Sequence, residues 1–248
     1  MLEVKHVSKT FNPGTITERK ALKDISLTLN DGDFVTVIGG NGAGKSTLLN
    51  LIAGVHECDS GSIILDGEDI TRQKEHIRAK YLGRVFQDPM RGTAATMEIQ
   101  ENLALALRRG KKRGLKWGVT SAEQEEFKKQ LSLLELGLEN RMTSKVGLLS
   151  GGQRQALTLL MATLQKPKLL LLDEHTAALD PKTAHKVLEL TQHFVERDHL
   201  TTFMVTHNMK HAIHYGNRLI MMLDGHIVYD VSGEEKKNLQ VADLLQKF

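Results

Sequence analysis

Apolar residues recur along the chain in two patterns, one typical of strands and one typical of helices. At 2–4 and again at 25–29 every second residue is apolar, which predicts half-buried strands of an antiparallel sheet near the N-terminus. Continuous apolar runs predict fully buried strands at 34–38, 169–172 and 202–205. Helical spacing separates these runs, and the alternation of strand and helix predicts a parallel sheet.

Residues 88–166 carry mostly helical spacing. Thr120 with Glu123, and Ser150 with Gln153, have the spacing of capping boxes, so each pair predicts the start of a helix. The predicted fold is therefore α/β, with a mixed, mainly parallel core sheet, an N-terminal antiparallel β subdomain and an inserted α-helical subdomain. We expect one domain over residues 1–248, in which 1–87 and 167–248 form the core with its β subdomain and 88–166 form the helical subdomain.

The C-terminal segment is expected to end on a short helix. Leu219–Leu223 and Ile227–Tyr229 flank Asp224-Gly225, which predicts a hairpin. After it, one helical face is predicted to carry the apolar residues Val241, Leu244, Leu245 and Phe248.

Composition excludes several classes of protein. With 40% hydrophobic and 25% charged residues, the 248-residue chain has the balance of an ordinary soluble globular protein. Its apolar runs are far shorter than the ~20 residues that cross a bilayer, and its first residues do not form an export signal, so we expect a cytoplasmic location. A net charge of +3 gives little reason to expect a nucleic-acid partner. Cys58 is the only cysteine, so an internal disulfide is excluded.

The segment after the strand at 34–38 has the sequence of a phosphate-binding loop. It reads G-x-x-x-x-G-K-S, and its residues are Gly39, Gly40, Asn41, Gly42, Ala43, Gly44, Lys45, Ser46 and Thr47. Glycines let the backbone N–H groups point at phosphate oxygens, and the helix that follows adds positive potential at its N-terminus. Lys45 adds a full positive charge, and the Ser46 hydroxyl is a ligand for Mg²⁺. The sequence thus predicts that ATP with Mg²⁺, or a related nucleotide, binds here.

Two carboxylates follow the apolar run at 169–172. Functional groups of α/β proteins lie at the carboxyl ends of their strands, where Asp173 and Glu174 are placed. Asp173 is suited to bind a metal ion, and Glu174 is suited to activate an attacking water. Two solvated loop acids would be an equally good interpretation in isolation, but not beside a phosphate loop.

The segment Leu149-Ser150-Gly151-Gly152-Gln153 supplies a second glycine-containing helix N-terminus, and with it a second anion-binding surface. With this LSGGQ sequence the chain resembles the ABC ATPase family, whose signature motif lies between the phosphate loop and the Asp-Glu pair. The resemblance extends over nearly the whole chain.

The resemblance assigns further roles. Gln87 matches the glutamine that contacts Mg²⁺, and His207 matches the switch histidine near the γ-phosphate, although a lone histidine at a strand end is more often structural. Ala178-Leu179-Asp180 matches the segment that signals across the dimer. Phe11 stands where the family usually has an aromatic residue that stacks on adenine; it could equally be a core residue.

In this family two cassettes pack head to tail, so the resemblance implies a second ATPase subunit, in a homodimer. Lys45, Ser46, Gln87 and Asp173 would bind Mg-ATP in one protomer. Ser150, Gly151, Gly152 and Gln153 would bind the γ-phosphate in the other. Glu174 and His207 would be the catalytic pair. The implied partners are an integral-membrane permease and an extracytoplasmic substrate-binding protein, which would place the chain at the cytoplasmic side of the cell membrane.

Other functions are possible for parts of this pattern. A cassette protein of translation or DNA maintenance usually has two cassettes or long coiled coils, and neither occurs here. A P-loop kinase would lack the signature. Transport, with import favoured, is therefore the predicted function.

The sequence departs from the family at two places. His175 follows the catalytic glutamate, where proline is usual, and Ala156–Leu160 replaces an arginine-rich segment. The C-terminal part looks most like a bacterial importer group linked to amino-acid uptake.

The chain also contains a basic cluster, which is either a solvated loop or a contact for anionic lipid. Its residues are Arg108, Arg109, Lys111, Lys112, Arg113 and Lys116.

Overall fold

The fold is given by a computed structural model that describes residues 1–111 and 118–247. Two compact units make up the chain. The first unit comprises Met1–Arg78 and His199–Phe248, and the second comprises Ala79–Asp198. The two are described separately below.

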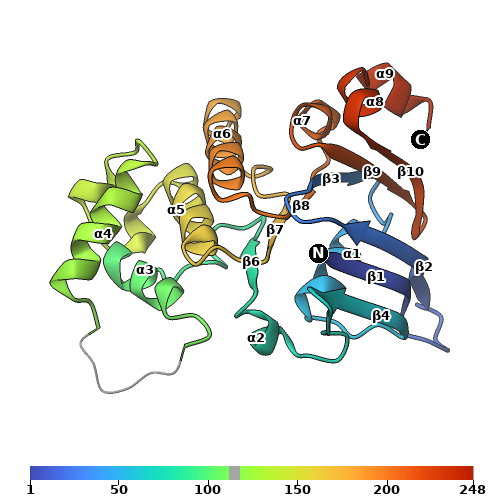
Figure 1. Cartoon of the computed structure of the whole chain (residues 1–248), viewed down its shortest axis with the longest axis horizontal. Coiled ribbons are helices and arrows are strands. Elements are labelled where there is room, and N and C mark those ends of the chain that lie inside the picture. The colour runs from blue at the N-terminus through green and yellow to red at the C-terminus, as the bar shows by residue number, and fades with distance from the viewer. Residues whose placement is uncertain (112–117, 248) are drawn as a thin grey trace. The chain divides into compact units, whose positions relative to one another are not determined.

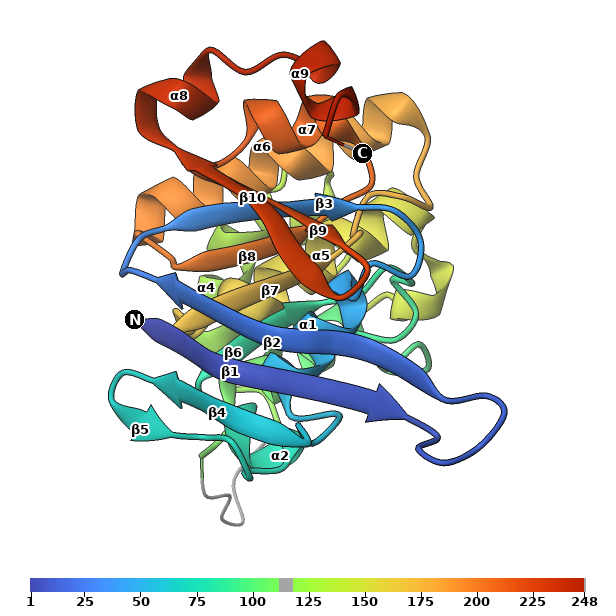
Figure 2. The ribbon, with the colours of Figure 1, turned by 90° about the vertical axis from the view of Figure 1, so that its right-hand side faces the viewer.

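The first unit contains the predicted antiparallel sheet, in the order β2-β1-β4-β5 (Figure 2). Its strands are β1 (Leu2–Phe11), β2 (Arg19–Leu29), β4 (Ser60–Leu65) and β5 (Glu68–Asp69). Leu2 lies between Leu29 of β2 and Leu65 of β4, and all three side chains are buried. The alternation of apolar residues therefore marked the inner face of this sheet, as expected.

The first unit also contains a second group of strands. They are β3 (Phe34–Gly39), β8 (Thr202–Val205), β9 (Arg218–Leu223) and β10 (His226–Ser232). β3 pairs in parallel with both β8 and β9, while β9 and β10 form the predicted antiparallel hairpin. The helices of this unit are α1 (Lys45–Ala53), α2 (Glu75–Arg78), α7 (Met209–His214), α8 (Gly233–Lys237) and α9 (Val241–Leu245).

Helices α7 and α9 pack on the outer side of β3, β9 and β10 (Figure 2). Ile38, Met221 and Leu244 belong to the apolar cluster that they enclose. The prediction for α9 was partly wrong, because Leu245 is 59% exposed whereas Leu244 is fully buried. Consecutive helical residues point about 100° apart, so a five-residue helix turns only one of the two toward the core. Phe248 lies outside the described residues.

In its described residues, the second unit has two parallel strands, the helices of the predicted insert and one further long helix (Figure 1). The strands are β6 (Leu82–Val85) and β7 (Leu169–Asp173), and the four leucines of β7 are fully buried, as predicted. The α-helices are α3 (Ile99–Leu107), α4 (Ser121–Ser132), α5 (Gly151–Thr163) and α6 (Pro181–Asp198), and the 3₁₀ helices are η1 (Leu138–Asn140) and η2 (Val146–Leu148). Both predicted capping boxes are present, Thr120 with Glu123 and Ser150 with Gln153.

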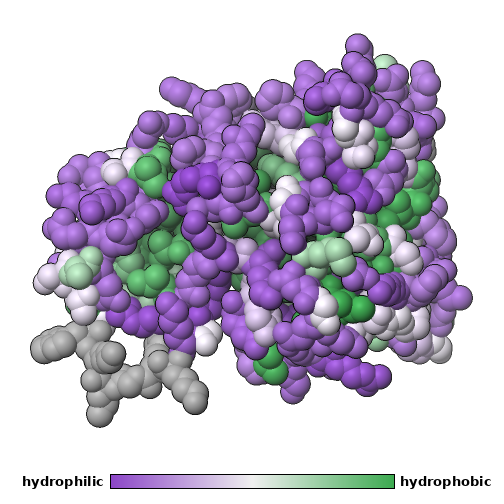
Figure 3. Space-filling model, viewed as in Figure 1, coloured by the Kyte–Doolittle hydropathy of each residue, from purple (hydrophilic) through white to green (hydrophobic). Residues whose placement is uncertain are grey.

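The face of the molecule drawn in Figure 3 is mostly hydrophilic, with small scattered apolar areas. Exposed large apolar side chains in the described residues include Leu148, which is 72% exposed, and Met90. In the described part of the chain, every helix is too short or too polar to cross a bilayer.

Candidate nucleotide-binding site

The phosphate loop connects β3 to α1 in the first unit, as the motif requires. β3 ends at Gly39 and α1 begins at Lys45. Gly44 has a φ of +102° and Gly42 a φ of +86°, values that side-chain-bearing residues rarely adopt. A Cβ atom on Gly44 would lie 2.6 Å from the backbone oxygen of Ala21. The loop conformation therefore depends on glycine at this position.

Lys45 lies inside this loop. Its Nζ donates hydrogen bonds to the backbone oxygens of Gly39 (2.8 Å) and Gly40 (3.1 Å), and the residue is only 6% exposed. The N-cap of α1 is Gly44, which has no side chain to cap the helix. A buried ammonium group and a helix N-terminus thus lie together, and both favour an anion. The same loop carries Asn41, Ala43, Ser46 and Thr47; Ser46 is exposed.

We expect Gly44→Ala to lower the free energy of unfolding by ~2 to 4 kcal/mol, because the added methyl clashes with backbone in a left-handed conformation. Gly40→Ala is the matched control, since its Cβ would have no neighbour within 4 Å. Urea denaturation of the two variants measures the difference. Equal stability of both variants would contradict this account of the loop.

The opposite end of α1 is held by a buried arginine. Arg78, which is 1% exposed, donates through Nη1 to the backbone oxygens of Leu51 (2.7 Å) and Ile52 (2.8 Å). Gly54 follows as a left-handed C-cap. Burial lowers the pKa of the Arg78 guanidinium, but its bonds to these carbonyls place the charge at the negative end of the helix.

Phe11 is half-buried at the end of β1, beside the phosphate loop. Its cross-strand partner is Arg19, and Arg19 Nη2 donates to the backbone oxygen of Gly42 at 2.8 Å. The Phe11 ring meets the His56 ring edge to face, with centroids 5.3 Å apart. A contact of Phe11 with the base of a nucleotide stays a prediction. Sequence reasoning missed Arg19 as a contact of the loop.

His207 follows β8 in the first unit and its side chain is exposed. Asn208 caps α7 directly after it, with its side chain accepting from the His211 N–H at 3.2 Å. Lys236, 2% exposed, binds the other end of α7 by donating to the carbonyls of Tyr215 and Gly216. Burial lowers the pKa of Lys236 to about 8. The histidine therefore precedes a helix that is fixed at both ends.

The second unit carries the predicted acidic pair at the end of β7. Asp173 lies 3.7 Å from the Arg84 guanidinium, and both side chains are less than a fifth exposed, at 17% and 14%. Glu174, the next residue, is half-buried and has a φ of +45°, in the left-handed region. The chain turns sharply at Glu174, where the Ala177 N–H donates to the Glu174 carbonyl at 2.9 Å.

The signature segment begins helix α5, as predicted. Ser150 is the N-cap: its Oγ accepts from the Gln153 N–H, and the Gln153 side chain accepts from the Ser150 N–H. Gly152 lies against α6, where an added Cβ would be 2.0 Å from Thr183 Cγ2. Ser150 and Gly151 are exposed. The serine and the first glycine are therefore available to another molecule, whereas the second glycine is needed for helix packing.

Gln87 is exposed just beyond β6. Gln155 of α5, which is fully buried, donates through Nε2 to the carbonyl of Phe86 at 3.0 Å and so connects the signature helix to the residue before Gln87. Sequence reasoning missed Gln155, because a glutamine within a helix has no local signal of its distant partner.

Two arginines of the basic cluster form hydrogen bonds inside the helical insert. Arg108 donates to the Glu123 carboxylate at 2.8 Å, and Arg109 donates to the Ala162 carbonyl. Residues 112–116 of this cluster are outside the described part.

Asp180, in the segment matched to the dimer-signalling element, precedes α6. The side chain and backbone of Thr183 donate hydrogen bonds that lower the pKa of Asp180. These bonds favour the charged form of Asp180 at the N-terminus of α6, where negative charge is favoured.

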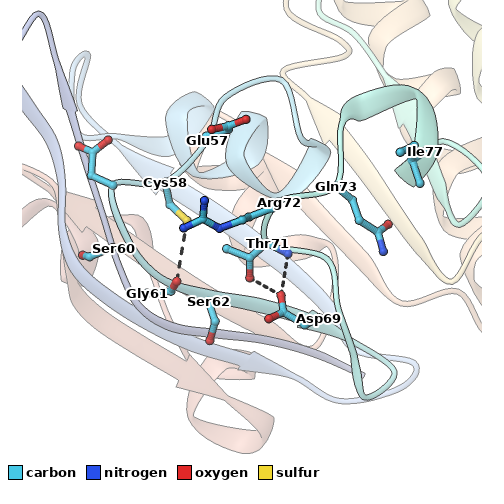
Figure 4. A pocket seen from close by; sticks show the side chains of 11 residues that line it. Glu57, Cys58, Ser60, Gly61, Ser62, Asp69, Thr71, Arg72, Gln73 and Ile77 are labelled. Atoms are coloured by element: carbon cyan, nitrogen blue, oxygen red, sulfur yellow. Dashed lines mark hydrogen bonds between the residues drawn. The ribbon is translucent and has the colours of Figure 1, made fainter.

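A polar depression of about 720 Å³ lies elsewhere in the first unit, near β4, β5 and α2 (Figure 4). Cys58, Asp69 and Arg72 are among its lining residues, and Thr71 donates to the Asp69 carboxylate. Cys58 is half-buried. None of the predicted site residues lines this depression.

Comparison with known families identifies the cassette. Residues 22–177, which include the phosphate loop, the signature and the acidic pair, match the ABC transporter family. The chain belongs to this family. It is accordingly an ATP-binding subunit, and members of the family are transport-coupled ATPases. Phe11 and His207 lie outside the matched range.

Similar proteins include a tyrosine transport ATP-binding protein of Clostridioides difficile, 48% identical over 253 residues that cover 100% of this chain and 98% of the relative. The ABC transporter ATP-binding protein YxdL of Bacillus subtilis is 37% identical, over a region that covers 99% of this chain and 93% of the length of YxdL. Among solved structures, the dimeric ATP-binding cassette MJ0796 bound to ADP and phosphate has 31% identity and a TM-score of 0.79, covering 94% of this chain and 98% of that one. The predicted ABC ATPase fold is confirmed.

Proposed function

We propose that two copies of this chain bind two molecules of Mg-ATP between the phosphate loop of one copy and the signature helix of the other. The buried ammonium of Lys45, bonded to the glycine carbonyls of its own loop, is the observation that carries this proposal. Each copy has a second exposed helix N-terminus at Ser150 and Gly151, suited to the γ-phosphate of a partner's nucleotide. The dimeric structure of the similar cassette MJ0796 supports the pairing.

The side chains assigned to Mg²⁺ present oxygen atoms, which are the ligands that this cation prefers. Ser46 would hold it from α1, and Asp173 and Gln87 would complete the protein ligands. The ion pair between Asp173 and Arg84 shows that the carboxylate is already placed beside a positive charge. Mg²⁺ would neutralise the triphosphate, while Lys45 and the loop N–H groups would orient it.

For hydrolysis, Glu174 would take the proton of the attacking water and His207 would orient the γ-phosphate. Phe11 would contact adenine from the end of β1. Separation of charge after hydrolysis would then reopen the dimer and drive a separate integral-membrane permease. We place the chain at the cytoplasmic face of the membrane through that permease. The division into a core at 1–87 and 167–248 and a helical subdomain at 88–166 stays a prediction.

We further propose that the transporter imports an amino acid or a close analogue, together with an extracytoplasmic binding protein. The 48% identity to a tyrosine transport protein over the whole chain supports this class of cargo. Relatives named for spermidine and putrescine import reach only 36% identity. Their names nevertheless support import as the direction.

Uptake by the source cells tests this class of cargo. Deleting the gene should lower the initial rate of radiolabelled tyrosine uptake severalfold and leave spermidine uptake unchanged. The intact chain should restore uptake and copurify with an integral-membrane protein. Loss of spermidine uptake alone would contradict the amino-acid assignment, and copurification with ribosomes or DNA in place of a membrane protein would contradict transport.

A further inference from the structure

His175, the residue that departs from the family pattern, lies directly after Glu174 and is buried. Its side chain is only 2% exposed. Of residues 174–180, which run from the end of β7 to the start of α6, it is the only one that is buried. The rest of this segment is exposed or half-buried, so the imidazole is the side chain that fixes the segment to the interior of the second unit.

One partner of the imidazole is a buried threonine of α6. His175 Nε2 lies 3.1 Å from the hydroxyl oxygen of Thr191, which is 1% exposed. The Thr191 hydroxyl donates its single proton to the carbonyl of Val187 at 2.8 Å. Its oxygen must therefore accept from the imidazole, because a hydroxyl has only one proton to donate. This requirement places a proton on His175 Nε2 and makes the bond directional.

The backbone conformation of Glu174 requires contacts that hold it in place. A left-handed conformation is unfavourable for a residue with a side chain, and it persists only where the surrounding structure enforces it. Pairing of β7 with β6 fixes the chain up to Leu172, and the turn bond from Ala177 closes on the Glu174 carbonyl. The His175 bond to α6 holds the residue between these two constraints.

We propose that His175 is a positioning residue, which through its hydrogen bond to Thr191 orients the Glu174 carboxylate toward the water that attacks ATP. This inference rests on the proposed role of Glu174 as the base. The imidazole touches neither nucleotide nor water in this scheme. Its loss allows the Glu174 backbone to relax, so the carboxylate leaves the productive position while the phosphate loop keeps its affinity for ATP.

The test compares ATP turnover and ATP affinity of the full chain carrying single substitutions. His175→Ala and Thr191→Val each remove the bond, and we expect kcat to fall about tenfold or more while the Kd for ATP changes less than twofold. Thr191→Ser keeps the hydroxyl and should retain the parental kcat. The double variant His175→Ala with Thr191→Val should lose no more than His175→Ala alone, because Thr191→Val removes a bond that His175→Ala has already removed.

Thr163→Val is the matched control for a buried helical threonine. Thr163 is 1% exposed and donates to the Leu159 carbonyl at 3.0 Å, but it has no histidine partner among the hydrogen bonds of the described residues. It should keep the parental kcat. If Thr191→Val kept it as well, or if kcat, ATP affinity and melting temperature fell together, His175 would have a structural role only and the proposal would be overturned.

Glu174→Gln separates this proposal from the one on which it rests. An inactive Glu174→Gln together with fully active His175→Ala and Thr191→Val would refute the positioning role alone. Parental turnover by Glu174→Gln would refute the assigned base, and the positioning role with it.

Discussion

Replacing Glu174 with glutamine should lower the turnover number at least about a hundredfold while ATP binding stays intact. The amide has nearly the shape of the carboxylate, so the turn at the end of β7 is kept, but it cannot take a proton from water. ATP would then remain at the interface and hold two copies together. Phosphate release measures the turnover, and size-exclusion chromatography with and without ATP measures the pairing.

Glu189→Gln serves as the control for this change. Glu189 lies on α6, is 56% exposed and pairs only with His185 in the ion pairs of the described residues. It should turn over ATP at the parental rate and form no lasting dimer. If Glu174→Gln behaved like this control, Glu174 would not be the base.

Replacing Lys45 with alanine should weaken ATP binding about ten- to a hundredfold, which corresponds to the ~1.5 to 3 kcal/mol of a hydrogen bond to a charged group. The change removes the ammonium from the phosphate loop and also its bonds to the carbonyls of Gly39 and Gly40. Turnover would fall with affinity, in contrast to Glu174→Gln. Isothermal titration calorimetry with ATP measures the dissociation constant.

The matched control for Lys45 is Lys128→Ala, an exposed lysine of α4. It lowers the net charge by the same amount but removes no contact with the loop, so the ATP affinity should stay parental. Unchanged affinity in Lys45→Ala would mean that the triphosphate binds elsewhere. A loss in Lys128→Ala of similar size would mean that overall charge, and not the loop, governs binding.

Elements with a short-range signal could be predicted from the sequence. The capping boxes at Thr120 and Ser150 join residues three positions apart, and the leucines of β7 form one continuous apolar run. The phosphate loop is likewise a local motif, because glycine conformations and a helix N-terminus are set within a few residues. For these parts the structure placed each residue as expected. The C-terminal helix is the exception, where a face of four apolar residues was expected and, of the three that the structure describes, only Leu244 is fully buried.

The sequence by itself therefore determined that this chain is an ABC cassette, and it predicted which residues would face ATP, since both inferences depend on spacings of a few residues. Only the tertiary structure decided what holds those residues in place. Arg19 binds the loop at Gly42 from 23 positions away, and His175 binds Thr191 16 positions further along. The residues near an arginine or a histidine in the sequence do not indicate its hydrogen-bond partner, because that partner depends on how the strands and helices pack.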